Sequence, residues 1–176
     1  MAIDETRVFK PINIAVLTVS DTRTAENDTS GDILAARVTD AGHKLAARMI
    51  VKDDARLLAA QFGAWIDDPL VDAVVSTGGT GLTGRDVTPE ALGLIEGARQ
   101  IPGFGELFRW LSFKTIGTSA VQSRACAVVA RGTYIFALPG SNGAVKDGWD
   151  GILAEQLDSR NRPCNFVDLM PRLKEV

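Results

Sequence analysis

The sequence is poor in the residues that form cross-links and metal centres. Among 176 residues it has two cysteines, Cys126 and Cys164, and one histidine, His43. Two isolated cysteines are too few for a disulfide framework or a CxxC metal site, so we expect two free thiols. One histidine excludes a multi-histidine metal site within a chain. Because His43 follows Gly42 near an expected helix end, we predict a solvated histidine beside a helix C-terminus.

Long apolar segments and an excess of positive charge are also missing. No apolar run approaches about 18 residues, so no transmembrane helix is expected. Residues 1–10 are polar and mixed in charge, unlike a signal peptide, and we therefore expect a cytoplasmic location. The formal net charge of −3 argues against general nucleic-acid binding. However, 13 of the 19 basic residues are arginines, whose forked donors suit phosphate or carboxylate, so a small anionic ligand is compatible with the composition.

What the sequence does contain is the patterning of one globular domain. Its 45% apolar and 23% charged residues are close to globular averages. Residues 12–19 are short, β-branched and almost continuously apolar, which is typical of a strand buried on both faces. Such runs alternate with helical patterns, which predicts an α/β three-layer sandwich with a mostly parallel sheet and helices on both faces. We expect residues 1–11 to form an irregular arm and residues 12–176 to form the domain.

The expected elements follow from apolar periodicity and capping signals. Thr88 and Pro89 predict a helix start, with Thr88 as N-cap and Pro89 as first helical residue. Two apolar runs joined by Arg131-Gly132 predict an antiparallel hairpin at one edge of the sheet. The aromatic side chains Trp65, Phe108 and Trp110 are assigned to the core or a subunit interface. We expect strands at residues 12–19, 45–51, 72–77, 125–130 and 133–138, and helices from about residue 29 to 42, through 57–66, from 88, and at 104–111 and 143–157.

Polar or glycine-rich segments follow the expected parallel strands. In open α/β sheets, ligands bind outside the carboxyl ends of the strands. Four such segments at one edge therefore predict a binding site there. These segments are Ser20-Asp21, Asp53-Asp54, residues 78–81 and residues 139–142.

The segment at residues 78–81 is the strongest single element, because Gly78, Gly79 and Gly81 surround Thr80. Three glycines allow positive φ angles and bring backbone N–H groups close to an anion such as phosphate. Residues 79–84 also spell GxGxxG, but this run follows the third strand and no helix opens directly from it. We therefore reject a dinucleotide fingerprint, and the absence of a following Gly-Lys-Ser/Thr excludes a Walker A loop.

Charged side chains beside this loop complete the candidate site. Asp86 lies between the glycines and the next helix start, and Asp53 and Asp21 lie on neighbouring loops. Magnesium is typically held by one or two carboxylates together with substrate phosphates, so these side chains are candidate ligands. Arg85 and Arg124 are candidate phosphate donors. The simpler alternatives are loop or cap roles for the aspartates and a surface ion pair for Arg124.

The residue pattern resembles that of a known family. Residues 77–91, TGGTGLTGRDVTPEA, resemble the signature of the MoaB/MogA family of molybdenum-cofactor biosynthesis proteins. Further matches follow in family order along nearly the whole chain, and the last of them looks particularly like MoaB. These matches are residues 17–21, 28–31, 102–106, 123–124, 138–141 and 160–166.

The resemblance implies a compact α/β domain that assembles as a homo-oligomer, a trimer or, in the MoaB branch, a hexamer. It implies binding of molybdopterin, a pterin with a dithiolene and a terminal phosphate. In active members, ATP and Mg²⁺ are used to transfer AMP onto that phosphate. The family's catalytic, metal-holding aspartates fall on Asp53 and Asp86. The predicted substrate-binding residues are Ser20, Asp21, Gly78, Gly79, Thr80, Gly81, Glu106, Ser123 and Arg124, and the predicted nucleotide-binding residues are Pro139, Gly140 and Ser141.

Two functions stay open at this point. One is a molybdopterin adenylyltransferase, and the other is a non-catalytic molybdopterin-binding, carrier or regulatory protein without ATP chemistry. Adenylylating relatives often have proline before the aspartate after the second strand, where this sequence has Lys52, whereas retention of Asp53 favours activity. A nucleotide-dependent oxidoreductase is disfavoured because the GxGxxG run is misplaced.

Overall fold

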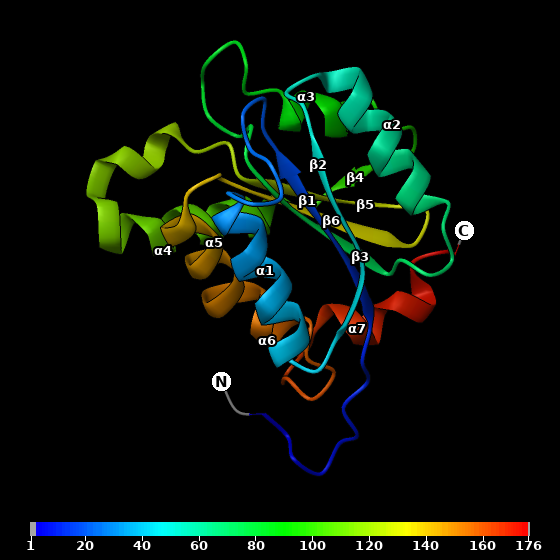
Figure 1. Ribbon diagram of the computed structural model, residues 1–176. Coiled ribbons are helices and arrows are strands. Elements are labelled where there is room, and N and C mark those ends of the chain that lie inside the picture. Colours follow the sequence, from blue (N-terminus) through cyan, green and yellow to red (C-terminus); the bar gives the residue numbers. More distant parts are fainter. Residues whose placement is uncertain (1–2, 176) are drawn as a thin grey trace.

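A computed structural model describes residues 3–175 as a six-stranded sheet between two layers of helices (Figure 1). The strand order is β2-β1-β3-β6-β5-β4, in which β2, β1, β3 and β6 are parallel and β5 is antiparallel to both neighbours. The strands are β1 Asn13–Val19, β2 Lys44–Val51, β3 Ala73–Thr77, β4 Arg99–Gln100, β5 Cys126–Ala130 and β6 Thr133–Leu138. The helices are α1 Thr29–Asp40, α2 Ala55–Ile66, α3 Thr88–Gly93, α4 Pro102–Ile116, α5 Asn142–Gly148, α6 Ala154–Gln156 and α7 Phe166–Leu169, with short 3₁₀ or π segments at Gly117–Gln122, Trp149–Leu153 and Met170–Arg172.

This architecture confirms the predicted fold class and the predicted hairpin. The turn between β5 and β6 uses positive φ angles at Arg131 (+49°) and Gly132 (+99°), which suit the right-handed twist of the strands that it joins. The outermost strand on that side is β4, which the sequence analysis missed. A strand of two residues is too short to leave an apolar pattern.

Each central strand is buried on both faces, as predicted from its continuous apolar sequence. Alternate side chains of β1 enter different clusters: Ile14 and Val16 pack on one face, and Leu17 and Val19 on the other. The first face is covered by α1 and α4–α7, and the second by α2 and α3 (Figure 1). Within residues 3–175, no helix is long and apolar enough to cross a membrane.

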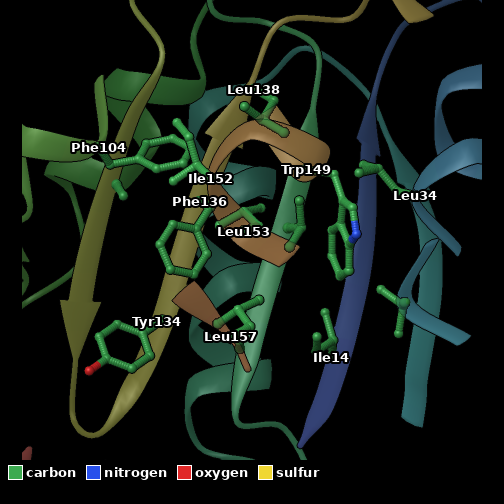
Figure 2. Close-up of a cluster of buried hydrophobic side chains, with 14 of the residues drawn as sticks. Ile14, Leu34, Phe104, Tyr134, Phe136, Leu138, Trp149, Ile152, Leu153 and Leu157 are labelled. Atoms are coloured by element: carbon green, nitrogen blue, oxygen red, sulfur yellow. The ribbon is translucent and has the colours of Figure 1, made fainter. Parts of the chain in front are cut away.

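The larger cluster is built around aromatic side chains of β6 (Figure 2). Phe136 is fully buried, and its ring centroid lies 5.2 Å from that of Phe104 on α4. Trp149 and Leu153 reach the same cluster from the helical segment after α5 (Figure 2). Burial of each such side chain stabilises the fold by about 1.5–3 kcal/mol, so this face holds the sheet and its carboxyl-edge loops in place.

Three aromatic side chains were predicted to lie in the core or at a subunit interface, and they differ in burial. Trp65 and Phe108 are buried, at 6% and 1% exposure, whereas Trp110 is 57% exposed. Trp110 lies on α4, whose apolar pattern therefore includes a face that the domain does not cover.

The prediction for His43 was wrong, because this side chain is buried rather than solvated. It is 6% exposed, and its Nδ1 atom accepts the Ile12 N–H at 3.3 Å. The Phe9 ring packs on it at a centroid distance of 5.2 Å. Burial lowers the pKa of His43 below its ordinary value. The N-terminal segment folds back over the end of α1, a contact between distant residues that helix-end rules do not describe.

Residues 3–11 form no helix, and their one β-bridge joins Ile3 to Asn161. Ion pairs tie the segment to the C-terminal part of the chain, Arg7 with Asp168 and Arg162 with Asp4. Residues 3–11 of the predicted arm are therefore irregular but held against the domain, and residues 1–2 of the predicted arm lie outside the described residues.

Candidate functional site

Four loops meet at the carboxyl edge of the sheet, as the sequence predicted. They follow β1, β2, β3 and β6, which are adjacent and parallel, so their carboxyl ends point the same way (Figure 1). The ligand-binding position expected for an open α/β sheet is thus formed by the four predicted segments.

The glycine loop, residues 78–81, starts with two positive φ angles, +104° at Gly78 and +65° at Gly79. The Gly78 N–H donates to the Leu138 carbonyl at 2.9 Å, so it is not free for an anion. A Cβ on Gly140 would lie 3.3 Å from the Gly78 Cα, which brings the loops after β3 and β6 into backbone contact. Glycine is required here by close approach as well as by backbone conformation.

The predicted capping role of Thr88 was wrong. Val87 is the N-cap of α3, and Thr88 is its first residue and is fully buried. The Thr88 hydroxyl donates to the Gly78 carbonyl at 2.9 Å, and its backbone N–H donates to the Gly79 carbonyl at 2.9 Å. The side chain braces the glycine loop, because the loop folds back over the helix start. Capping rules consider only neighbours in sequence and could not predict this contact.

The two predicted catalytic aspartates both lie against this glycine loop, Asp53 from the loop after β2 and Asp86 from the segment before α3. A Cβ on Gly79 would lie 3.3 Å from Asp53 Oδ1, and a Cβ on Gly81 would lie 2.7 Å from Asp86 Oδ2. Asp86 Oδ2 accepts the Thr83 N–H at 2.9 Å and the Thr83 hydroxyl at 2.6 Å. Burial raises the pKa of Asp86, but these bonds and the Gly81 N–H outweigh it and hold that pKa below the ordinary value.

The pKa of Asp53 is shifted in the opposite direction to that of Asp86. Burial first, and then the negative charge of Asp21, raise the pKa of Asp53, and Asp86 adds to this effect. A cation would relieve the repulsion among these carboxylates. Within residues 3–175, no group of three or more His, Cys, Asp or Glu side chains could hold a metal ion. The chain therefore fits Mg²⁺ as a partial site, with two carboxylates and the remaining oxygens supplied by phosphate and water.

Ser20 and Asp21 shape the loop after β1. The Ser20 hydroxyl accepts the N–H groups of Thr22 and Arg23 at 3.2 and 3.1 Å. Asp21 Oδ1 accepts the Asp53 N–H at 3.3 Å, which joins this loop to the loop after β2. The structure thus brings Asp21 next to Asp53, whereas the Ser20 hydroxyl bonds within its own loop.

A buried cap holds the other end of the loop after β1. Asp28 is the N-cap of α1; its carboxylate accepts the Gly31 N–H at 3.0 Å and the Thr18 hydroxyl at 2.7 Å. Arg48 on β2 also donates to it at 2.9 Å. A Cβ on Gly31 would lie 2.0 Å from Asp28 Oδ2, which explains the glycine of the 28–31 match.

The guanidinium of Arg124 bonds to groups of this chain. Its Nε donates to the Gly81 carbonyl at 2.7 Å, one terminal nitrogen donates to the Asp86 carbonyl at 2.6 Å, and the other forms an ion pair with Glu90. The Arg124 N–H also donates to the Thr80 carbonyl at 2.9 Å. The side chain therefore fastens both ends of the 80–86 segment. Sequence reasoning missed Glu90, because no local pattern links residues 34 positions apart.

The predicted nucleotide-binding residues Pro139, Gly140 and Ser141 form a loop whose contacts also stabilise the fold. The Pro139 carbonyl accepts the Thr77 hydroxyl at 3.1 Å, and Ser141 is the N-cap of α5, accepting the Ala144 N–H at 3.2 Å. Of the three predicted residues, Gly140 lies directly against Gly78 of the glycine loop. The Thr80 hydroxyl in that loop is buried and has no hydrogen-bond partner within the described chain.

Glu106 and Ser123 lie apart from the aspartates. Glu106 lines a cavity of about 450 Å³ between α3, α4 and β5, together with Arg109, Arg124 and Cys126. Arg124 also lines a smaller cavity of about 360 Å³ beside Asp86. The Ser123 hydroxyl accepts the Ala125 N–H at 3.2 Å. The predicted substrate residues therefore fall on two sides of Arg124.

Both cysteines are free, as predicted, and Cys126 lines the larger cavity. Burial raises the pKa of its thiol to about 11, so Cys126 is a protonated wall residue near neutral pH.

Comparison with known proteins gives consistent matches. The chain is 51% identical over 167 residues to molybdenum cofactor biosynthesis protein B of Escherichia coli (strain K12), covering 95% of this chain and 96% of that protein. It is 42% identical over 160 residues to the protein of the same name from Bacillus subtilis (strain 168), with 89% and 94% covered. A crystal structure of a molybdenum cofactor biosynthesis protein B superposes with a TM-score of 0.85 at 36% identity, covering 97% of this chain and 100% of that chain.

The family profile described as "probable molybdopterin binding domain" matches residues 15–159, which include all four carboxyl-edge loops. This match spans most of the chain and agrees with the resemblance found at residues 77–91. The chain belongs to the family of probable molybdopterin binding domains.

Proposed function

We propose that this protein acts in molybdenum cofactor biosynthesis, binds molybdopterin, and transfers AMP from ATP to the terminal phosphate of the pterin in a Mg²⁺-dependent reaction. Family membership supports molybdopterin as the ligand. The observation that carries the catalytic part is the glycine loop with Asp53 and Asp86 against it, at the carboxyl edge of the sheet. Two carboxylates at the carboxyl edge of a parallel sheet, where ligands bind in open α/β folds, are the protein's share of a metal–nucleotide site.

The proposed step is an in-line displacement at the α-phosphorus of ATP. An oxygen of the molybdopterin phosphate forms a bond to that phosphorus. The bond from the same phosphorus to the α,β-bridging oxygen breaks, and pyrophosphate leaves with the electron pair. Such a reaction needs positioning and charge stabilisation rather than a strong base. When bound, Mg²⁺ supplies charge neutralisation on the phosphates.

The chain's own residues have distinct parts in this proposal. Asp86 is fixed by Thr83 and stays ionised near neutral pH, so it would hold the cation firmly. Asp53 carries a raised pKa and would gain most from a nearby positive charge. Arg124 keeps the backbone of the 80–86 segment in place. The Thr80 hydroxyl in the glycine loop is buried and has no hydrogen-bond partner within the described chain.

Purified protein incubated with molybdopterin, Mg²⁺ and ATP tests this function. We expect AMP-pterin and pyrophosphate in equal amounts. Asp86→Asn preserves side-chain volume and should lower turnover by a factor of about 100–1,000, the loss typical for removing one electrostatic stabiliser. Asp40→Asn removes a similar charge at the far end of α1 and should leave turnover unchanged. Full turnover in the Asp86 variant would show that the metal assignment is wrong.

A second candidate is a molybdopterin-binding carrier without ATP chemistry. It is favoured by the lack, within residues 3–175, of a complete metal-binding cluster and by arginines that already pair with the protein's own carboxylates. The same incubation separates the two candidates, because the carrier would bind the pterin and release no pyrophosphate.

We further propose that the protein is a homo-oligomer whose interface includes the end of α4 and the 3₁₀ segment after it. Trp110, Phe113 and Ile116 are 57%, 56% and 55% exposed, and Val121 is 81% exposed. An apolar surface of this kind on a soluble chain is typical of a protein contact. Phe113→Asp should shift the protein toward monomer in size-exclusion chromatography with light scattering. A monomeric wild-type protein would refute this assembly.

A further inference from the structure

Arg85 lies beside the proposed metal site without a part in the proposed reaction. It is on the loop between β3 and α3, and its side chain is 66% exposed. It reaches across to Asp21 in the loop after β1, with Nε 3.0 Å from Asp21 Oδ2 and a second guanidinium nitrogen on the same oxygen. The other oxygen of Asp21 accepts the Asp53 N–H at 3.3 Å. One ion pair therefore links two loops at Asp53.

The guanidinium of Arg85 and the carboxylates around it shift one another's pKa values. The hydrogen bonds that Arg85 donates to Asp21 are the main reason why the pKa of Arg85 is raised, and the charges of Asp53 and Asp54 add to this effect. In return, Arg85 lowers the pKa of Asp53, against burial and the repulsion from Asp21 and Asp86. Arg85 thus supplies positive charge to the carboxylates that the proposed function assigns to a cation.

We propose that Arg85 is a tethered counter-ion that holds Asp21 beside Asp53 while no divalent cation is bound, and that Mg²⁺ at Asp53 and Asp86 competes with the positive charge of this guanidinium. This inference rests on the proposed placement of Mg²⁺ at Asp53 and Asp86. Binding of Mg²⁺ at Asp53 and Asp86 then breaks the ion pair between Arg85 and Asp21.

The geometry favours a contact that opens easily. Arg85 and Asp21 are exposed in their side chains by 66% and 36%, and an exposed ion pair is weak and screened by salt. A weak pair can neutralise the carboxylates in the empty protein without preventing a divalent ion from replacing it. The link from Asp21 to the Asp53 backbone means that this exchange also affects the loop after β2.

Binding of Mn²⁺, a paramagnetic substitute for Mg²⁺, is measured in the presence of inorganic phosphate, which supplies the phosphate oxygens that the partial site lacks. This measurement tests the inference without any reading of turnover. We expect Arg85→Ala to bind Mn²⁺ about two- to fivefold more tightly than wild type, the range expected for release of one exposed ion pair. Arg85→Lys keeps the charge and should stay close to wild type. Arg162→Ala is a matched control, because Arg162 forms another exposed ion pair, with Asp4 in the N-terminal segment, and should leave the affinity unchanged.

A second measurement follows the Arg85 side chain directly. In ¹⁵N-detected spectra, the Nε–H signal of Arg85 should move on addition of Mg²⁺, as its bond to Asp21 opens. Equal Mn²⁺ affinities in wild type and Arg85→Ala would overturn the counter-ion role and leave the metal site standing. No Mn²⁺ binding in either protein would overturn the proposed metal site and the counter-ion role together.

Discussion

Replacement of Gly78 by alanine tests how the glycine loop obtains its shape. Gly78 has a φ of +104°, and an added Cβ would lie 2.2 Å from the carbonyl oxygen of Val19, the last residue of β1. Real Cβ contacts are essentially never under 3.0 Å, so backbone must move. That backbone is fixed, because the Gly78 N–H is bonded to Leu138 and its carbonyl to Thr88.

The cost has two parts. A left-handed backbone at alanine costs roughly 1–2 kcal/mol. Overpacking against fixed neighbours costs about 1–3 kcal/mol more. We therefore expect Gly78→Ala to lower the free energy of unfolding by about 2–5 kcal/mol. For a chain of this length, 1 kcal/mol corresponds to about 2–4 °C in Tm, so the midpoint should fall by roughly 10 °C.

Urea unfolding followed by tryptophan fluorescence measures this change, because Trp65 and Trp149 are buried. Gly84→Ala is the matched control: it lies in the same loop, and nothing lies within 4 Å of its added Cβ. It should change the free energy of unfolding by no more than about 0.5 kcal/mol. If the two variants unfold at the same urea concentration, the reasoning about close approach at Gly78 is wrong.

Two further predictions concern the cap of α1 and the bonds of Arg124 to the 80–86 segment. Asp28→Asn should destabilise the fold by about 2–4 kcal/mol near neutral pH, since it breaks a buried bond to Arg48. Burial raises the pKa of Asp28, but bonds from Arg48, Thr18 and the Gly31 N–H outweigh it and hold that pKa below its ordinary value. Its contribution is therefore complete above about pH 4 and is lost as the pH falls through the lowered pKa of the folded state, so the difference in urea unfolding between variant and wild type should shrink as the pH falls below about 4. Arg124→Lys keeps the charge and loses the forked donors, so turnover should fall about tenfold or more while the free energy of unfolding changes by less than about 1 kcal/mol. Unchanged turnover would show that Arg124 does not position Asp86.

Much of the site could be predicted because the responsible signals are local. Strand ends, glycine clustering and the aspartates next to them are read from neighbouring residues, and parallel pairing places those strand ends at one edge. The roles of Thr88 and His43 could not be predicted in this way. Thr88 reaches back ten residues to Gly78, and His43 is covered by Phe9 from another segment.

The arginines show the same division. Their number was compatible with a small anionic ligand, but the sequence pattern does not show which side chains they pair with. In the structure, Arg124 pairs with Glu90 and Arg85 pairs with Asp21, over separations of 34 and 64 residues in the chain. A long arginine side chain reaches whichever carboxylate the fold brings near, and only the folded chain decides which one that is.

By itself, the sequence determined the α/β class, the order of the main elements, the edge where the loops gather, and the family resemblance that the comparisons confirmed. These follow from periodicity and short motifs, which depend on neighbouring residues. The tertiary structure alone decided the two-residue strand β4, the buried histidine, the brace from Thr88, and the pairing of Arg85 with Asp21 beside Asp53. These features depend on contacts between distant segments, whose geometry is set when both faces of the sheet are packed.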